Sequence, residues 1–172
     1  PDKAKNDIEK VKDKVDIVIV AMHWGTEYSM GVSSEQQQIA NYLSSLGVQL
    51  IIGTHPHVVE PIEYINNGKT LVIYSLGNFI SDQEGIERLT GLMMEVTINK
   101  VETDTESIVT VDSPRTELIY TDSNYGKKRS FKVYPYSKLD DSILLNYQNY
   151  YDEYKAVVSS KYSDLKWGLS RS

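Results

Sequence analysis

The sequence contains no cysteine. This absence excludes disulfide bonds, thiol catalysis and zinc sites built on cysteine, and it leaves the cellular compartment open. No apolar stretch approaches the roughly 20 residues that a membrane-spanning helix needs, and no signal peptide is visible. Because the chain begins at Pro1 and enters a charged segment directly, we expect any membrane anchor to lie upstream of it.

Basic residues are too few and too scattered for a nucleic-acid surface. The chain has 18 Lys and Arg against 24 Asp and Glu, which gives a net charge of −6. Apart from Lys127-Lys128-Arg129, the basic side chains are spread along the sequence, so we expect no nucleic-acid partner. The glycine patterns G-x-G-x-x-G and G-x-S-x-G and a Walker loop are also missing, which removes the usual signatures of nucleotide-binding loops and serine hydrolases.

The composition and the length of the chain fit one globular domain with a short additional segment. Apolar residues make up 40% of the chain and charged residues 24%, proportions that are ordinary for a soluble globular protein. A length of 172 residues suffices for one α/β core but not for two domains of ordinary size.

The first half of the chain predicts a strand, a helix and a second strand. Residues 15–22 and 48–52 are short, β-branched runs typical of strands buried on both faces of a parallel sheet. A helix is predicted over 35–46, with Ser33 or Ser34 as its N-cap and a glycine directly after it. In such a unit the loops at the carboxyl ends of the strands carry the chemistry.

Further strands and one more helix follow. Apolar runs at 58–65 and 69–75 flank Asn-Asn-Gly, a strong hairpin signal, so the sheet is predicted to be mixed. Residues 91–101 and 107–120 predict two longer strands. The preceding residues 2–14 have the apolar spacing of a surface helix.

We divide the chain into a domain over residues 1–121 and an extension over 122–172. The extension is predicted to hold a short strand at 131–136 and a tyrosine-rich helix within 142–160, and its tail after Tyr162 is expected to fray. The helix tyrosines favour packing onto the domain, with a platform for carbohydrate or peptide as the alternative.

All three histidines of the chain follow predicted strands. His23 comes directly after the first strand, and His55 and His57 follow the second in GTHPH. Neighbours two apart in an extended segment face the same way, so the three imidazoles predict a site for one or two divalent ions, with Mn, Fe or Zn favoured. The alternative is that these are loop histidines that satisfy backbone carbonyls. A two-metal centre also needs bridging carboxylates, which we expect upstream.

Polar residues near these loops are candidate partners. Asn78 in YSLGNF is predicted to present its amide to a metal ligand or a substrate, with Gly77 at positive φ, or else to cap backbone groups. Glu27, Glu60 and Glu63 are candidate acids or second-layer partners, or simply solvated charges.

Residues 16–79 carry a resemblance to a known family. They read DIVIVAMHWGTEY, then QQQIANYLSSLG, then LIIGTHPHVVEPIE, then GKTLVIYSLGNF. This order and spacing resemble the CapA/PgsA family of bacterial capsule (poly-γ-glutamate) synthesis proteins, and the similarity becomes loose after Ser81.

The resemblance implies a fold and a site. The family is similar to the calcineurin-like metallophosphatases, so we expect a mixed β-sheet sandwich with flanking helices, an α/β/β/α fold truncated at its N-terminal half. By analogy His23 would be the isolated metal ligand, while His55 and His57 would be the paired ligands. The chain has G-x-H-x-H where the phosphatases have G-H-x-H, which leaves open which histidine serves which metal. The family's N-terminal ligand motifs are absent, so this fragment alone is expected to be inactive.

The resemblance also implies a biological setting. The family acts at the outer face of the bacterial membrane, on an anionic poly-γ-glutamate or related polymer and beside the membrane subunits of the capsule synthase. Two hypotheses follow: a metal-dependent hydrolase or transferase acting on a phosphate ester or γ-glutamyl bond, or a non-catalytic accessory subunit that binds or tethers the polymer.

Overall fold

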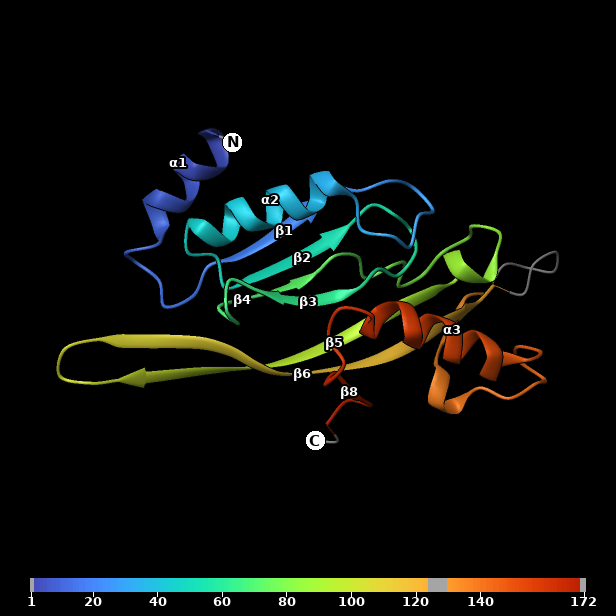
Figure 1. The fold of residues 1–172 in the computed structure, drawn as a ribbon. Coiled ribbons are helices and arrows are strands. Elements are labelled where there is room, and N and C mark those ends of the chain that lie inside the picture. The colour runs from blue at the N-terminus through green and yellow to red at the C-terminus, as the bar shows by residue number, and fades with distance from the viewer. Residues whose placement is uncertain (1, 124–129, 171–172) are drawn as a thin grey trace.

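The computed structural model describes residues 2–123 and 130–170 (Figure 1). Within these ranges it is an α/β protein with a mixed sheet, an antiparallel sheet and three α-helices. The basic run Lys127-Lys128-Arg129 lies outside the described residues. None of the helices in the described ranges has the length and apolar character needed to cross a membrane.

The mixed sheet has the strand order β1-β2-β4-β3. β1 (Ile19–His23), β2 (Leu50–Thr54) and β4 (Thr70–Ile73) are parallel, and β3 (Ile62–Ile65) is antiparallel to β4. The helix α2 (Ser34–Ser45) connects β1 to β2. The predicted strand-helix-strand unit and mixed sheet are therefore confirmed, and the carboxyl ends of β1 and β2 lie side by side.

The local signals for α2 and the hairpin act as the sequence predicts. Ser33 is the N-cap of α2 and forms a capping box with Gln36. After the helix, Gly47 has a φ of 94° and its N–H donates to the Ser44 carbonyl at 3.0 Å, which closes the C-terminus. Positive φ angles through the Asn-Asn-Gly turn join β3 to β4.

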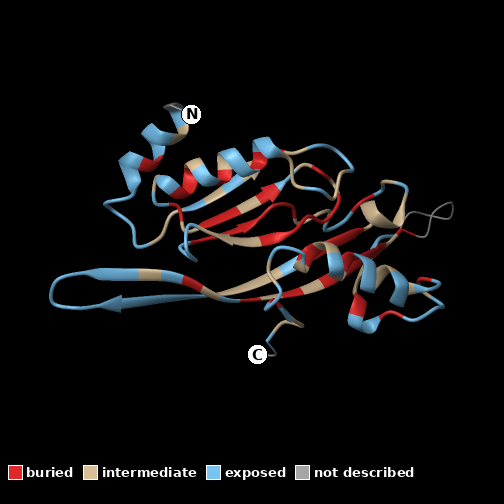
Figure 2. Cartoon of the chain, in the orientation of Figure 1, coloured by how far each residue is buried: buried red, intermediate tan, exposed pale blue. Residues whose placement is uncertain are grey.

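The second sheet is built around one long hairpin. β5 (Thr90–Glu102) and β6 (Ser107–Asp122) pair in antiparallel fashion, and β7 (Lys132–Pro135) pairs with the end of β6. β8 (Lys166–Trp167) pairs with the middle of β6 in parallel. The far part of the hairpin extends beyond the rest of the molecule and is mostly exposed (Figures 1 and 2).

Successive side chains in the strands of the mixed sheet point to opposite faces, and this creates two hydrophobic clusters. In β2, Leu50 belongs to the cluster shared with the second sheet, whereas Ile51 faces the helices. In β4, Leu71 and Val72 divide in the same way. α1 (Asp2–Val11) and α2 thus cover one face of the mixed sheet, and the second sheet covers the other (Figure 1).

The remaining helix, α3 (Tyr147–Ser159), packs into the cluster between the sheets through Tyr154 and Val158. Two short 3₁₀ turns precede it in the chain, η1 (Ile86–Arg88) before β5 and η2 (Tyr136–Lys138) after β7. Tyr136 joins the same cluster. The extension predicted over 122–172 therefore contributes to the same core as the sheets.

Two predictions are wrong in detail. β1 is not buried on both faces: its residues alternate between exposed and half-buried, and Ile19 is 47% exposed. β1 pairs only with β2 among the described residues, so it is an edge strand there. Residues 163–170 do not fray either, because Leu165 is buried and β8 follows it directly in the second sheet.

Candidate metal centre

The three histidines come together at the carboxyl edge of the mixed sheet. His23 is the last residue of β1 and lies opposite Thr54, the last residue of β2. The ring centroids of His23 and His55 are 4.4 Å apart, and those of His55 and His57 are 6.2 Å apart. The parallel pairing of β1 with β2 therefore brings imidazoles that are more than thirty positions apart in the sequence into contact.

The backbone that carries His55 and His57 is not extended, contrary to the prediction. Both residues have positive φ angles, 105° and 61°. L-residues adopt this region at a cost of order 1–3 kcal/mol each, and such strain is concentrated at functional sites. The two rings thus reach the same site through a strained turn rather than through the alternation of a strand.

Backbone hydrogen bonds hold the two histidine loops together. The Trp24 N–H donates to the Thr54 carbonyl at 3.1 Å, and the Tyr28 N–H donates to the Pro56 carbonyl at 2.8 Å. Each loop therefore fixes the position of the other.

Gly53 is required by a close approach of backbone and indole. A Cβ atom at this position would lie 1.9 Å from the Tyr74 carbonyl oxygen and 2.4 Å from Trp24 Nε1. The indole N–H of Trp24 donates to that same carbonyl at 2.8 Å in the buried interior. A glycine at position 53 therefore permits this close approach of the two backbone segments.

Glu27 joins His55 and His57 in a group that could hold a metal ion. One ligand atom from each of the three side chains lies within 4.8 Å of the others. Glu27 is exposed and the two histidines are half-buried, so the group opens to solvent. His23 is exposed and adjoins His55 at the edge of this group. The assignment of individual residues as ligands stays a prediction.

Asn78 orients His57. Its Oδ1 lies 3.0 Å from His57 Nδ1. The Nδ2 of Asn78 is surrounded by acceptors, so Oδ1 must face the imidazole, Nδ1 carries the proton, and Nε2 keeps a lone pair for a metal. The acceptors around Nδ2 are the Arg88 carbonyl at 2.8 Å, Gln83 Oε1 at 3.0 Å and Ser81 Oγ at 3.2 Å.

Gly77 allows Asn78 this position. Its φ is 65°, as predicted, and a Cβ there would lie 2.7 Å from the Thr90 carbonyl oxygen. The adjoining residues link the two sheets, since the Leu92 N–H donates to the Leu76 carbonyl at 2.8 Å. Asn78 therefore both orients a histidine and satisfies backbone groups, so the two alternatives from the sequence coexist.

Glu60 is a buried acid beneath the site. It is fully buried, its Oε2 accepts from Gln36 Nε2 at 2.6 Å, and its Oε1 has no hydrogen-bond partner among the described residues. Burial raises the pKa of Glu60 to about 7, although the hydrogen bond from Gln36 partly opposes this. Gln36 also lies close under Gly25, in the loop that carries Glu27. Glu60 thus supports that loop from below.

Glu63 contacts side chains other than the histidines of the site. Its Oε2 accepts from the Tyr74 hydroxyl at 3.0 Å and pairs with Lys161 Nζ at 3.2 Å. Among the described residues, none of its hydrogen bonds or ion pairs involves a histidine.

Two residues at the rim of the site were missed in the sequence. The guanidinium of Arg88 lies 4.7 Å from the centroid of the Tyr28 ring, and that ring lies 6.1 Å from the His57 ring. Tyr28 stands in the HWGTEY motif and could have been singled out there. Arg88 carried no sequence signal, because it comes from η1 and reaches the site only through the fold.

These features define an α/β protein with three imidazoles and a carboxylate clustered at the carboxyl edge of parallel strands. Comparison with known proteins supplies the family. The sequence profile of the family described as "Bacterial capsule synthesis protein PGA_cap" matches residues 1–83, and this part of the chain belongs to that family. The match includes all three histidines and Asn78 but ends before β5.

Individual relatives agree with this assignment. "PGA biosynthesis protein CapA" of Bacillus subtilis is 47% identical over 76 residues, which cover 44% of this chain and 20% of the relative. "Capsule biosynthesis protein CapA" of Bacillus anthracis is 38% identical over 87 residues, covering 48% and 21%. A "Probable polyglutamine synthesis accessory protein" of Mycobacterium tuberculosis is 35% identical over 71 residues, covering 41% and 18%. The matches span about a fifth of the length of these curated relatives.

Proposed function

We propose that this chain contributes a divalent-metal site to a capsule synthesis protein that acts on poly-γ-glutamate or a related anionic polymer. The site would serve a metal-dependent hydrolase or transferase acting on a phosphate ester or γ-glutamyl bond. The observation that carries the proposal is the group formed by Glu27, His55 and His57, together with the hydrogen bond from His57 Nδ1 to Asn78 that leaves Nε2 free to bind a metal.

The donor set fits a first-row transition metal. Two imidazoles and one carboxylate suit Mn, Fe or Zn better than Ca or Mg, which prefer oxygen ligands. Glu27, His55 and His57 would hold the ion, and His23 would supply a further donor from beside His55. A divalent ion in such a site supplies Lewis acidity toward a phosphoryl or carbonyl oxygen.

The rim would receive the anionic part of the substrate. Arg88 rests on Tyr28, whose ring adjoins His57, so its guanidinium lies at the rim of the site and is separated from His57 by that ring. A guanidinium forms paired hydrogen bonds with carboxylate and phosphate groups, and both occur in the proposed substrates.

The same proposal extends to the surrounding protein. We regard the two sheets as the C-terminal part of a metallophosphatase-like α/β/β/α domain whose N-terminal part supplies more carboxylates. The protein would sit at the outer face of the membrane, held by an upstream segment and working with membrane subunits of the capsule synthase. The length of the curated relatives, about five times the matched region, supports such additional parts.

A second candidate function is a non-catalytic accessory role. The Mycobacterium tuberculosis relatives are each described as a "Probable polyglutamine synthesis accessory protein", which favours this role. In this case the histidine site would bind polymer carboxylates or a partner protein without turnover.

Metal binding is tested by titrating Mn²⁺ and Zn²⁺ while observing the histidine side-chain NMR signals. The chain has three histidines and all lie at the site, so each imidazole signal reports on it. We expect stoichiometric binding that weakens by about tenfold or more in His55→Ala, His57→Ala and Glu27→Gln. Glu35→Gln, a matched change of an exposed carboxylate in the first turn of α2, should leave the affinity unchanged.

Catalysis is tested on the full-length protein with a phosphodiester and a γ-glutamyl substrate. The enzyme hypothesis expects turnover that stops on chelation and is lost in His55→Ala and His57→Ala. Activity that survives both substitutions removes the enzyme hypothesis. Polymer binding by the metal-free protein, without turnover, would establish the accessory role instead.

A further inference from the structure

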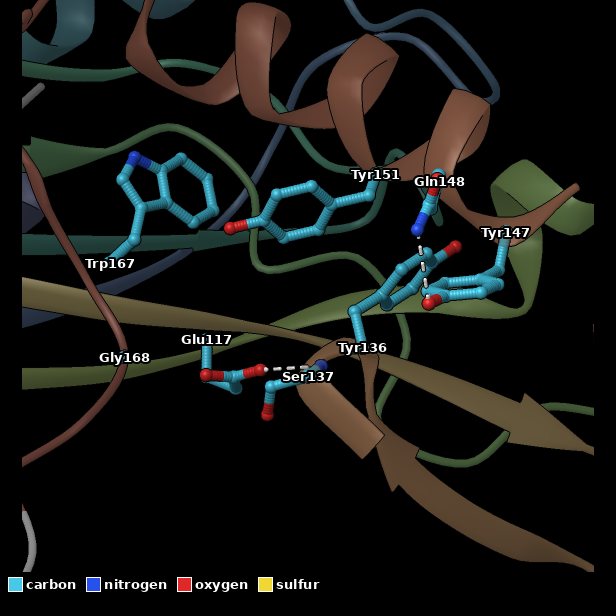
Figure 3. Close-up of a pocket in the computed structure, with 8 residues that line it drawn as sticks. All are labelled: Glu117, Tyr136, Ser137, Tyr147, Gln148, Tyr151, Trp167 and Gly168. Carbon is cyan, nitrogen blue, oxygen red and sulfur yellow. Dashed lines mark hydrogen bonds between the residues drawn. The ribbon is translucent and has the colours of Figure 1, made fainter. Parts of the chain in front are cut away.

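The tyrosines of α3 divide into two groups. Tyr154 is buried in the core between the sheets, in line with the packing interpretation. Tyr147 and Tyr151 are half-buried and line a pocket of about 380 Å³ that lies between α3, η2, β6 and β8 (Figure 3). This volume falls within the range of roughly 300–1,000 Å³ typical of small-molecule sites. The pocket shares no lining residue with the histidine site.

Aromatic rings form much of the pocket wall. Trp167 meets Tyr151 edge to face, with ring centroids 5.9 Å apart and planes at 71°. Tyr136 lies 6.1 Å from Tyr151 on the other side. Figure 3 shows these rings gathered around one hollow, with the side chains of Gln148 and Glu117 at its border. The pocket thus combines apolar ring surfaces with polar groups at its edge.

Several of these polar groups are available to a ligand. The Tyr151 hydroxyl makes no hydrogen bond to the other described residues, and it points along the pocket wall toward Trp167 (Figure 3). Gln148 Nε2 donates to the Tyr147 hydroxyl at 3.3 Å, which leaves the amide oxygen of Gln148 free to accept. Glu117 Oε1 accepts from the Ser137 N–H at 3.2 Å, which leaves its second oxygen available.

Charge argues for an uncharged ligand. The carboxylate of Glu117 lines the pocket and repels anions. The ammonium of Lys155 already lies over two of the rings, 5.5 Å from the centroid of Tyr151 and 5.4 Å from that of Trp167. A second cation would meet both this charge and rings that are already engaged in cation–π contacts. The opposite charges of Glu117 and Lys155 leave the pocket without a net charge of one sign, which favours an uncharged ligand over an anionic polymer or a quaternary ammonium group.

We propose that the pocket is a saccharide-binding site that takes a neutral pyranose ring. A pyranose offers an apolar C–H face and a border of hydroxyl groups, the complement of aromatic rings edged by hydrogen-bonding side chains. The C–H face lies against Trp167 and Tyr151, while the hydroxyls bond to Glu117 and Gln148. This inference does not depend on the metal site or on the proposed function.

The fold holds the pocket wall in place. Arg115 Nε donates to the Gly168 carbonyl at 2.8 Å, and the Gly168 N–H donates to the Thr116 carbonyl at 2.9 Å. These bonds fix the segment that carries Trp167 against β6. The tryptophan is therefore pre-positioned, which reduces the entropy lost when a ligand binds.

Tryptophan fluorescence provides the test. The chain has two tryptophans, and Trp24 is buried against Tyr74 in the helix-facing cluster, so Trp167 alone reports on the pocket. We titrate with methyl β-D-glucopyranoside and with N,N′-diacetylchitobiose. We expect a saturable change with a Kd between about 0.1 and 10 mM, and loss of the signal in Trp167→Phe.

Substitutions in the pocket separate binding from folding. Tyr151→Ala should weaken the saccharide affinity measured by calorimetry about tenfold or more. Tyr151→Phe keeps the ring, so its loss of affinity should be much smaller. Gln148 is exposed, so Gln148→Ala tests a polar contact without disturbing the core. Tyr42→Ala on α2 removes a half-buried tyrosine outside the pocket and should leave the affinity unchanged.

Three results would overturn the proposal. The first is the absence of saturable binding of either saccharide up to about 100 mM. The second is binding that remains unchanged in both Tyr151→Ala and Gln148→Ala. The third is a proline-rich peptide, choline or poly-γ-glutamate that binds at Trp167 more tightly than either saccharide does.

Discussion

The buried carboxyl of Glu60 should make the stability of the protein fall as the pH rises. Burial raises its pKa from the ordinary value of 4.5 to about 7, and the side chain is fully buried. Below pH 4.5 the carboxyl is protonated in the folded and unfolded states alike. Between pH 4.5 and 7 the unfolded chain releases its proton first, so the free energy of unfolding falls with rising pH.

The size of this effect follows from the pKa difference. Each pKa unit corresponds to about 1.36 kcal/mol, so a change from 4.5 to about 7 corresponds to about 3 kcal/mol. The loss is complete above pH 7. The nearby Tyr74 hydroxyl does not titrate in this window, because burial raises its pKa further above the ordinary value. A comparison between variants separates the contribution of Glu60 from those of the other titratable groups.

Glu60→Gln isolates the contribution of this acid. The amide stays neutral and keeps an acceptor for Gln36, so it imitates the protonated carboxyl. Urea unfolding should give similar stabilities for the two proteins at pH 4, and at pH 8 the variant should be more stable by up to about 3 kcal/mol. Glu35→Gln, at an exposed position, should leave the pH dependence unchanged. A wild-type protein that loses no stability relative to Glu60→Gln between pH 4 and pH 8 would refute the reasoning.

Three further predictions concern the site and its supports. Asn78→Leu should weaken metal binding by about 10- to 100-fold, because His57 loses the acceptor that keeps its proton on Nδ1. The resulting change in the tautomer of His57 is visible in ¹⁵N shifts, and an unchanged tautomer would contradict the assignment. Gly53→Ala should destabilise the protein by more than about 2 kcal/mol in urea unfolding, because the new Cβ would lie 1.9 Å from a carbonyl oxygen, whereas Gly31→Ala, with its nearest atom at 3.8 Å, should have little effect. Ser33→Ala removes the N-cap of α2 and should cost about 1 kcal/mol by the same measurement; a loss below a few tenths would argue against the capping box.

The local signals in the sequence were reliable where one short segment determines the structure. Ser33, Gly47 and the Asn-Asn-Gly turn each act through backbone geometry within a few residues, and each appears as predicted. The adjacency of His23 and His55 was also predictable, because parallel strands joined by a helix end at the same edge.

Features that depend on contacts between residues far apart in the sequence were harder to predict from it. The β-branched sequence of β1 resembles that of a central strand, yet its exposure depends on which strands flank it. The positive φ angles of His55 and His57 carry no sequence signal, since neither residue type requires them. Arg88 reaches the site because its carbonyl accepts from Asn78, a contact that no spacing in the sequence indicates.

The hydrogen bonds of Asn78 tie the histidine site to a region outside the family match. That match ends at residue 83, but Arg88 accepts from Asn78, and the neighbouring Leu76 is bonded to Leu92 of β5. A protein cut after residue 83 would keep every imidazole but lose two bonds that support Asn78, namely the one to the Arg88 carbonyl and the one between Leu92 and Leu76. The segment that matches the family thus shares hydrogen bonds with residues that follow it, and substitutions along η1 and β5 can alter the histidine site without changing a candidate ligand.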